Sequence, residues 1–529
     1  MIKRIFIIAA IIFLNGCNSL SLKTDNDENQ LSSSVNDTTK TINKSSIPVC
    51  PIKEGPIDPE SHLDVWQRIS EQLSLKVPDN RRVYSQKAWY LKHPSYIKRV
   101  SERAKPYLYF IVSELEKRKL PVELALLPIV ESAFDPFAYS HGRASGMWQF
   151  VPNTGKGYGL KQNWWYDGRR DVYLSTHAAL DYLSYLNKRF KGDWLLALAA
   201  YNSGQGSVRK AVRLNKNKGK PTDFWSLKLP RETKAYVPKL LALAEILRSQ
   251  KENNTPWTVI KNQPFFTRVN TGSQIDIALA ADLSEQSMKE FYQLNPAFNH
   301  WSTDPKGPHH ILIPIEKKVL FETNLKTIPL KERIAYKRYI IKQGESLISI
   351  ARKFSTSVAL LKSNNNIRGT RIRAGKSLLI PVPSKKREKY AKSSQQRRLL
   401  KQNVKRAGFK KFITVSAGDS FWTLSRQHKV NLRSLAKWNS MAPTDTLKIG
   451  QKLVIWSKQP LKTASIKHSR QTTKKIRYKV RNGDSFARIA DKFNVSLKKI
   501  KKWNRSLSRK KYLQPGQSLT LFVDITKQF

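Results

Sequence analysis

The sequence has few cysteines, and its histidines are scattered. Only Cys17 and Cys50 occur among 529 residues, which excludes a disulfide-rich scaffold and a cysteine-rich metal site. The nine histidines form no HExxH pattern and no other metal-binding pair, so a zinc enzyme is not expected either. The sequence therefore implies no metal and no cofactor.

Acidic residues are also few. The 39 Asp and Glu stand against 96 Lys and Arg, which gives a formal net charge of +57. A surface this basic repels itself unless it meets a polyanion, and nucleic acid, an anionic membrane face and an acidic polysaccharide all qualify. With 40% hydrophobic and 26% charged residues the chain is otherwise typical of globular proteins, and its length suggests about three to five domains.

The first apolar run is too short to span a bilayer. Two basic residues precede ten apolar ones, from Ile5 to Leu14, which is the pattern of a secretory signal. The run ends in Leu14-Asn15-Gly16-Cys17, which resembles the bacterial lipobox. Residues 1–16 are therefore expected to be a lipoprotein signal peptide, cleaved before Cys17. A plain signal peptide followed by a chance cysteine is the alternative.

The lipobox resemblance also implies a destination. Cys17 would carry lipid, and Asn18 follows it instead of the aspartate that retains many such lipoproteins in the inner membrane. The expected location is the outer membrane, with the protein facing the periplasm and residues 17–60 serving as a flexible polar tether. Export argues against nucleic acid as the ligand of the basic surface.

Residues 61–250 predict one mostly α-helical domain. Leu183, Leu186 and Phe190 recur at helical spacing, and strand signals are scarce. Two apolar stretches, Trp194 to Ala200 and Tyr236 to Leu247, predict buried helices. The expected fold class is multidomain, with this helical domain ahead of smaller α+β units.

The C-terminal half contains three copies of one pattern. Each copy begins with a Gly-Glu-Ser or Gly-Asp-Ser element and reaches an asparagine 21 residues after that glycine. A short apolar strand precedes the element and another closes the copy, with two short helical stretches between them. The paired residues are Gly344 and Asn365, Gly418 and Asn439, and Gly483 and Asn504.

This strand–helix–helix–strand unit resembles the LysM domain, a small module that binds glycans containing N-acetylglucosamine. The resemblance places LysM copies at residues 336–383, 412–457 and 476–524. The serine or the aspartate oxygen of each element is expected to cap the first helix. Which copy binds glycan stays open. The stretches between copies, residues 384–411 and 458–475, are rich in Lys and Arg and are expected to be flexible linkers.

A fourth, degenerate copy is expected within residues 251–335. Three short stretches follow the pattern with a two-residue shift and without the Gly-Gln element: Asn270-Thr271-Gly272-Ser273, Leu294-Asn295-Pro296 and Ile311-Leu312-Ile313-Pro314. The alternative is a plain α+β spacer.

Four elements in the helical domain form an ordered set. They are Glu131-Ser132-Ala133-Phe134-Asp135-Pro136 followed by Ser140, Gly146-Met147-Trp148-Gln149, Ala200-Tyr201-Asn202, and Glu232-Thr233-Lys234-Ala235-Tyr236. Each element alone is weak, but the four in order resemble the lysozyme-like domain of soluble lytic transglycosylases. Met147-Trp148 stands where the common pattern has Leu-Met, an apolar exchange that affects only the expected shape of the groove.

Glu131 is the expected catalytic acid. Cleavage of a glycosidic bond needs an acid that protonates the leaving oxygen. Glu131 follows the apolar run Leu126-Leu127-Pro128-Ile129-Val130, and apolar surroundings raise the pKa of a carboxyl group. By the resemblance, this residue first donates a proton and then accepts one from the C6 hydroxyl of N-acetylmuramic acid, which closes a 1,6-anhydro ring.

The resemblance assigns roles to five further residues. Gln149 and Ser140 would hydrogen-bond the substrate near the cleaved bond, Tyr201 and Asn202 would line the groove, and Tyr236 would place its hydroxyl near Glu131. For each of the five, packing or capping is the alternative role, and a structural role weighs most for Asn202.

A second carboxylate near Glu131 would instead favour a hydrolase. Asp135 fits the end of a helix better than a nucleophile, whereas Asp167 and Asp171 flank two arginines with which they could pair. Ser132 has no His–Asp pair spaced to activate it, and His141 is expected to be a loop residue.

The sequence thus predicts a lytic transglycosylase of the outer membrane that cleaves peptidoglycan for cell-wall turnover or remodelling. LysM modules would hold it on its insoluble substrate, since weak tethered modules gain avidity through effective concentration. Two alternatives stay open: a hydrolytic muramidase, and a non-catalytic peptidoglycan-binding lipoprotein.

Overall fold

A computed structural model describes residues 63–529 except 458–472, 494, 509–512 and 525–529. The predictions for the signal peptide, the tether and the lipidated Cys17 therefore lie outside the described residues, as does most of the second linker. Within the described part of the chain, no helix is both long enough and apolar enough to cross a membrane.

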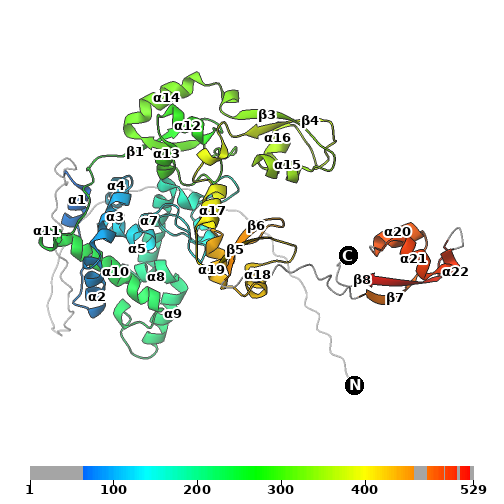
Figure 1. Ribbon diagram of the computed structural model, residues 1–529. Coiled ribbons are helices and arrows are strands. Elements are labelled where there is room, and N and C mark those ends of the chain that lie inside the picture. The colour runs from blue at the N-terminus through cyan, green and yellow to red at the C-terminus, as the bar shows by residue number, and fades with distance from the viewer. Residues whose placement is uncertain (1–62, 458–472, 494, 509–512, 525–529) are drawn as a thin grey trace, which may run out of the picture. The chain divides into compact units, whose positions relative to one another are not determined.

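The first described domain is helical, as the sequence predicted. It contains no β-strand between residues 63 and 253 (Figure 1). Its α-helices are α1 Val65–Glu71, α2 Arg81–Leu91, α3 Pro94–Ala104, α4 Leu108–Lys117, α5 Leu127–Ser132, α6 Pro152–Gly157, α7 Val172–Arg189, α8 Trp194–Ser203, α9 Gln205–Lys216, α10 Arg231–Arg248 and α11 Gln250–Asn253. Short 3₁₀ helices are η2 Val122–Leu126, η3 Gly168–Arg170 and η4 Phe224–Ser226.

Helix α10 lies at the centre of this domain. It packs against α1, α2, α5 and α8, and its leucines at 240, 241 and 243 are fully buried. Each such side chain contributes about 1.5–3 kcal/mol relative to an exposed one. Both apolar stretches predicted as buried helices belong to this core, the second within α10 and the first within α8.

Aspartates cap the N-termini of helices α7 and α8. Asp171 accepts a 2.7 Å hydrogen bond from the backbone N–H of Leu174 at the start of α7. Asp193 accepts one of 2.9 Å from Leu196 at the start of α8. Each side chain satisfies a backbone donor that the helix cannot pair internally.

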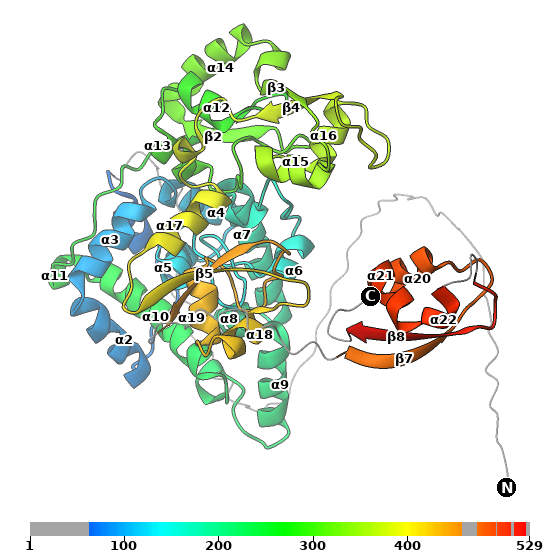
Figure 2. The same cartoon turned by 45° about the vertical axis from the view of Figure 1, so that its right-hand side comes forward.

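Four strand–helix–helix–strand modules follow (Figures 1 and 2). In each, the two strands pair antiparallel. The modules are β1 Phe266–Asn270, α12 Ile277–Leu283, α13 Met288–Leu294 and β2 His310–Pro314; β3 Ala335–Ile340, α15 Leu347–Phe354, α16 Val358–Asn364 and β4 Ser377–Val382; β5 Phe409–Thr414, α18 Phe421–Gln427, α19 Leu432–Trp438 and β6 Lys452–Ser457; and β7 Thr473–Lys479, α20 Phe486–Lys492, α21 Leu497–Trp503, α22 Arg505–Ser508 and β8 Ser518–Asp524. Helix α14 Lys318–Thr327 follows the first module.

Each module contains one asparagine whose side chain hydrogen-bonds its second helix to its closing strand. Asn439 donates to the carbonyls of Leu435 and Val454 and accepts from the N–H of Val454, at 2.7–2.9 Å. The bonds join the end of the second helix to the closing strand, and the side chain is buried. Asn365 and Asn504, the other two residues at the 21-residue offset, make the same three bonds.

Asn295 makes this set of bonds in the first module, with Phe291 and Leu312. The predicted degenerate copy therefore has the same internal brace as the three regular ones. The serine caps are present as well: Ser346, Ser420 and Ser485 each accept a hydrogen bond from a backbone N–H in the first turn of the following helix. That prediction is confirmed.

The basic stretch 384–411 differs from the flexible linker that was expected. It contains helix α17 Ser394–Asn403, and Tyr390 ahead of the helix is buried, its hydroxyl 2.9 Å from both carboxylate oxygens of Asp276. Gln402 is buried too and donates to Asn439. The expectation of flexibility was wrong. It rested on the density of Lys and Arg alone, whereas the buried side chains of Tyr390 and Gln402 hold the stretch against neighbouring elements.

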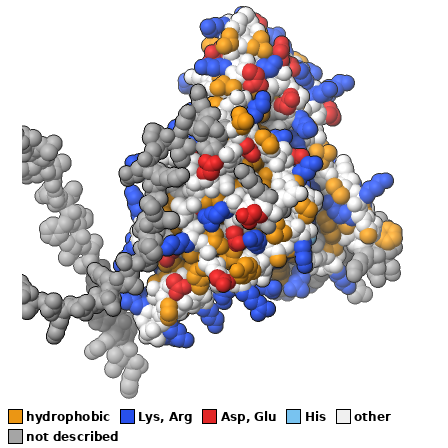
Figure 3. Space-filling view, turned by 90° about the vertical axis from the view of Figure 1, so that its left-hand side faces the viewer, with side chains coloured by type: hydrophobic (Ala, Val, Ile, Leu, Met, Phe, Trp, Pro, Cys, Tyr) orange, Lys and Arg blue, Asp and Glu red, His pale blue; other side chains and the backbone are white. Residues whose placement is uncertain are grey.

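One face of the molecule shows how its basic side chains are arranged there. On the face drawn in Figure 3, Lys and Arg lie scattered among acidic and apolar groups instead of forming one patch. On this face no single cluster of basic side chains stands out as a site for one anion.

Candidate active site

Glu131 lies near the end of α5, where apolar packing fixes the backbone. Leu126, Leu127 and Ile129 on the preceding turn are at most 1% exposed. The helix stops because Ala133 and Phe134 adopt left-handed backbone conformations, with φ of 52° and 53°. Glu131 therefore stands at the open end of a short helix whose other side is embedded in the core.

A cavity of about 680 Å³ opens in front of Glu131, a volume typical of ligand pockets. All six residues that the sequence singled out in this domain line it, although they come from four separate segments: Glu131, Ser140, Gln149, Tyr201, Asn202 and Tyr236. The structure thus brings the predicted set together in one place.

Tyr236 on α10 contacts the carboxyl group directly. Its hydroxyl donates a 2.6 Å hydrogen bond to Glu131 Oε1. Burial raises the pKa of Glu131 to about 7, the Tyr236 hydrogen bond pulls that pKa down, and the nearby charge of Glu232 pushes it up. A carboxyl group whose pKa lies near neutral pH can gain or lose a proton there, so it is suited to both donating and accepting one.

Ser140 and Gln149 lie on the connection between α5 and α6, residues 133–151, which we name the α5–α6 loop. Gln149 Nε2 donates a hydrogen bond of 2.7 Å to the Gly146 carbonyl. Ser140 Oγ accepts a hydrogen bond of 3.0 Å from the Ala144 N–H. Gly146 has φ of 85°, and a Cβ there would lie 2.0 Å from the Arg169 carbonyl oxygen. Only glycine fits that approach.

Tyr201 and Asn202 end helix α8 at the cavity wall. Tyr201 donates its hydroxyl to the Trp148 carbonyl at 2.8 Å, which ties α8 to the α5–α6 loop. Asn202 Oδ1 accepts 2.8 Å from the Thr233 hydroxyl, which ties α8 to α10. Both side chains line the cavity and also hold its walls together.

The rejected candidates have structural partners. Asp135 accepts from the N–H of Phe137, Asp167 forms an ion pair with Arg169, and Asp171 caps α7 and accepts from the Tyr166 hydroxyl. None of the three lines the cavity. Among the residues that the structure describes, no group of three or more His, Cys, Asp or Glu side chains is placed to hold a metal ion.

Ser132 and His141 also lie as expected. The Ser132 hydroxyl is 3.0 Å from the carbonyl of Met147 and 3.2 Å from that of Pro128, so it bonds backbone. His141 is an exposed loop residue at the rim of the cavity.

Sequence reasoning assigned no role to several residues of the cavity wall, among them Tyr182 on α7, and Glu232 and Lys239 on α10. Glu232 precedes Tyr236 by four positions, which places both side chains on one face of α10. That spacing was available in the sequence and could have identified Glu232. Tyr182 lies in an ordinary helix with no motif, so nothing in the sequence marked it.

Three family models match parts of this chain. Residues 109–224 match the family described as "Transglycosylase SLT domain". The LysM domain matches residues 339–381, 413–456 and 478–522. Residues 265–330 match "Lytic transglycosylase MltD, LysM-like domain", which is the segment for which the sequence predicted a degenerate copy.

Individual relatives extend the likeness to most of the chain. "Membrane-bound lytic murein transglycosylase D" of Escherichia coli K12 is 39% identical over 409 residues, covering 75% of this chain and 86% of that protein. "Cell wall-binding protein YocH" of Bacillus subtilis is 34% identical over 94 residues, 18% of this chain and 28% of its own.

Among solved structures, lytic transglycosylase Slt from Pseudomonas aeruginosa matches 28% of this chain and 25% of its own, with 26% identity and a TM-score of 0.22. The identity to the E. coli enzyme over three quarters of the chain, together with the SLT and LysM matches, decides the family. The chain belongs to the lytic transglycosylase family represented by membrane-bound lytic murein transglycosylase D.

Proposed function

We propose that this enzyme cleaves the β-1,4 bond between N-acetylmuramic acid and N-acetylglucosamine in peptidoglycan and leaves 1,6-anhydro-muramic ends. Its work is the turnover or remodelling of the cell wall. One observation carries the proposal: a carboxyl group with a pKa of about 7, hydrogen-bonded to a tyrosine, faces a cavity of about 680 Å³.

Glu131 acts first as an acid. Its proton goes to the glycosidic oxygen as the C1–O bond breaks, and the N-acetylglucosamine side leaves as an alcohol. The carboxylate that forms is stabilised by the Tyr236 hydroxyl, whose bond to Glu131 Oε1 strengthens when its acceptor is charged.

The same carboxylate then acts as a base. It takes the proton of the C6 hydroxyl while that oxygen attacks C1, which closes the anhydro ring and returns Glu131 to its protonated form. No water is consumed. Since the attacking hydroxyl belongs to the sugar being cleaved, much of the entropic cost of bringing reactants together is already met.

The remaining predicted residues hold the sugar. Ser140 and Gln149 hydrogen-bond the substrate beside the cleaved bond, and Tyr201 and Asn202 form the facing wall of the groove. The hydrogen bonds of the last two to Trp148 and Thr233 keep that wall rigid.

The LysM modules bind glycan strands and raise the local concentration of substrate at the cavity. The domain limits are those expected from the sequence: catalytic residues 61–250, a degenerate LysM copy within 251–335, and LysM copies at 336–383, 412–457 and 476–524. The similarity of 94 residues of this chain to a protein described as cell wall-binding supports this role.

Cys17 anchors the enzyme by lipid in the outer membrane, with the catalytic domain in the periplasm. Growth with a radiolabelled fatty acid tests this: wild-type protein should carry label and sediment with outer-membrane vesicles. Cys17→Ser should lose both properties. Label retained on the serine variant would refute the anchor.

A hydrolytic muramidase is the second candidate, because Glu232 places another carboxylate at the cavity wall. Digestion in ¹⁸O-labelled water separates the two reactions. A transglycosylase gives anhydro ends without label, whereas hydrolysis places one labelled oxygen at C1 of each new reducing end. Labelled reducing ends would assign the reaction to the muramidase.

A further inference from the structure

Arg169 is a buried arginine next to the α5–α6 loop, and no motif pointed to it. It is 6% exposed and belongs to η3, outside the cavity. A guanidinium this deeply buried needs nearly all of its donors paired, because an unpaired buried charge is strongly destabilising. The partners of Arg169 are therefore informative.

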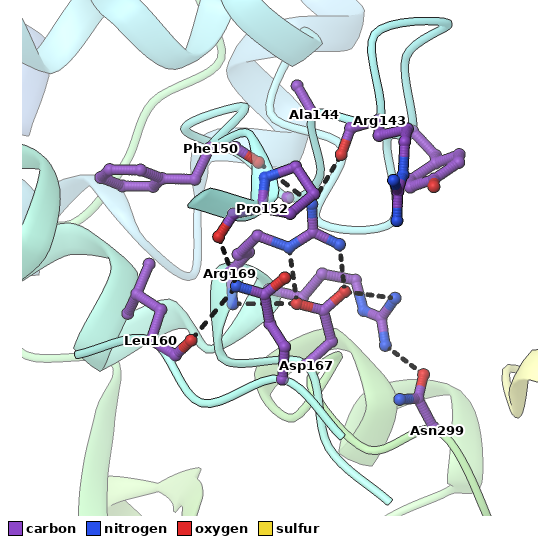
Figure 4. A network of polar contacts seen from close by, with 12 residues as sticks. Arg143, Ala144, Phe150, Pro152, Leu160, Asp167, Arg169 and Asn299 are labelled. Carbon is purple, nitrogen blue, oxygen red and sulfur yellow. Dashed lines mark hydrogen bonds and ion pairs between the residues drawn. The ribbon is translucent and has the colours of Figure 1, made fainter. Parts of the chain in front are cut away.

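The guanidinium joins a carboxylate to two points of the loop (Figure 4). Nε and Nη2 donate to the two oxygens of Asp167, at 2.9 and 2.8 Å. Nη1 donates to the carbonyls of Arg143 and Phe150, at 2.6 and 3.2 Å. The residues between these two carbonyls are 144–149, a segment that ends in Gln149. Ser140 lies three residues before Arg143 in the same loop.

The loop needs this outside support. It has no helix or strand, only isolated bridges from Ser145 to Tyr139 and Phe150. Arg143 and Gln149 adopt left-handed backbone conformations, with φ of 68° and 48°, which cost free energy in residues other than glycine. A conformation of this kind persists only when surrounding contacts hold it.

We propose that Arg169, oriented by Asp167, is a positioning residue that holds Ser140 and Gln149 in the geometry that the substrate requires. The inference rests on the proposed function and deepens it. Arg169 acts through the two loop carbonyls, and its fork geometry is essential because a lysine ammonium cannot bridge both carbonyls and both carboxylate oxygens.

The Asp167 side of the network is itself fixed by the LysM-like segment. The Asp167 N–H donates to the Ala297 carbonyl at 2.9 Å. Arg170, with Nη1 3.5 Å from Asp167 Oδ2, donates to the Pro296 carbonyl and to Asn299, which is labelled in Figure 4. The degenerate LysM copy thereby supports the catalytic loop, in addition to any role in glycan binding.

The test is a mutant cycle in the full-length chain. Release of glycan products from purified peptidoglycan is followed for wild type, Arg169→Lys, Ser140→Ala/Gln149→Ala, and the triple variant. Arg169→Lys should lower kcat/KM about 10- to 100-fold, as expected for a misplaced contact. In the background that lacks both loop side chains, the same change should cost less than about threefold, because the groups it positions are gone.

Arg68→Lys is the matched control. Arg68 is equally buried and forks onto Glu116, but it contacts α4 and not the loop. Arg68→Lys should lower the melting temperature about as much as Arg169→Lys does, and it should leave kcat/KM within about twofold of wild type. Asp167→Asn, which removes the charge of the partner and keeps the shape of its side chain, should reproduce the direction of the Arg169→Lys effect if the lysine variant does not fold.

The outcomes separate the two proposals. Inactive wild-type protein overturns the proposed function and this inference together. Active wild type with equal Arg169→Lys losses in both backgrounds overturns only the positioning role, as does normal kcat/KM in both the Arg169 and Asp167 variants. A loss confined to the background that retains Ser140 and Gln149 supports it.

Discussion

The hydroxyl of Tyr236 lies 2.6 Å from Oε1 of Glu131 and donates a hydrogen bond to it. Tyr236 comes from the central helix α10 and Glu131 from the short helix α5, 105 residues earlier. The bond stabilises the ionised carboxylate, whereas burial favours the protonated acid. These two effects and the nearby negative charge of Glu232, which raises the pKa, together place the pKa of Glu131 at about 7.

Removing the hydroxyl should therefore shift the activity profile. In Tyr236→Phe the pKa of Glu131 rises, because the contact that lowers it is lost. The alkaline limb of the pH–rate profile moves to higher pH, and the maximal rate falls about tenfold through loss of one charge-assisted hydrogen bond. Rates of product release between pH 5 and 9 measure both effects. A shift to lower pH would contradict the account.

Glu232→Gln should move the same limb in the opposite direction. The negative charge of Glu232 raises the pKa of Glu131, so its removal lowers that pKa and activity is lost at a lower pH. The maximal rate should stay within about tenfold of wild type if Glu232 only tunes its neighbour. A loss of a hundredfold or more, typical of a missing acid or base, would identify Glu232 as a second catalytic carboxylate.

The buried acid should also make stability depend on pH. The pKa of Glu131 is about 7 in the folded state and 4.5 as its ordinary value. Between these values the unfolded chain releases a proton that the folded chain keeps, so stability falls as pH rises from 4.5 to 7. Glu131→Gln cannot ionise and should gain up to ~3 kcal/mol over wild type across this window. Urea unfolding of Glu131→Gln and of wild type at pH 4.5 and pH 8 tests this. An equal difference in unfolding free energy between the two proteins at both pH values would refute it.

The asparagine brace predicts a local effect in the second LysM module. Asn439→Ala removes one hydrogen bond to Leu435 in α19, two to Val454 in β6 and one from Gln402, and leaves backbone groups unpaired. The module should lose about 2–4 kcal/mol, seen as faster hydrogen exchange in peptides from residues 412–457. Lys437→Ala on the exposed side of the same helix is the control and should change little. Equal exchange in both variants would show that the brace contributes nothing.

Much of this arrangement was predictable because its signals are periodic or repeated. The three 21-residue offsets pointed to Asn365, Asn439 and Asn504, and the structure shows why: each links helix to strand in the same way. The four ordered motifs predicted residues that share one cavity, although no local rule relates Glu131 to Tyr236.

The parts that were missed depend on tertiary contacts. The ordered stretch around Tyr390 was expected to be flexible because net charge says nothing about one buried tyrosine beside Asp276. Arg169 was considered only as a partner for nearby aspartates, since a sequence does not reveal that its fork also reaches two loop carbonyls.

The most direct test of the central claim is to digest purified peptidoglycan with the mature protein and with Glu131→Gln and to determine the masses of the released muropeptides. We predict products about 18 Da lighter than those of hydrolysis, the mass of one water, from the wild type alone. Products with ordinary reducing ends, or anhydro products from the Glu131→Gln variant, would contradict the account.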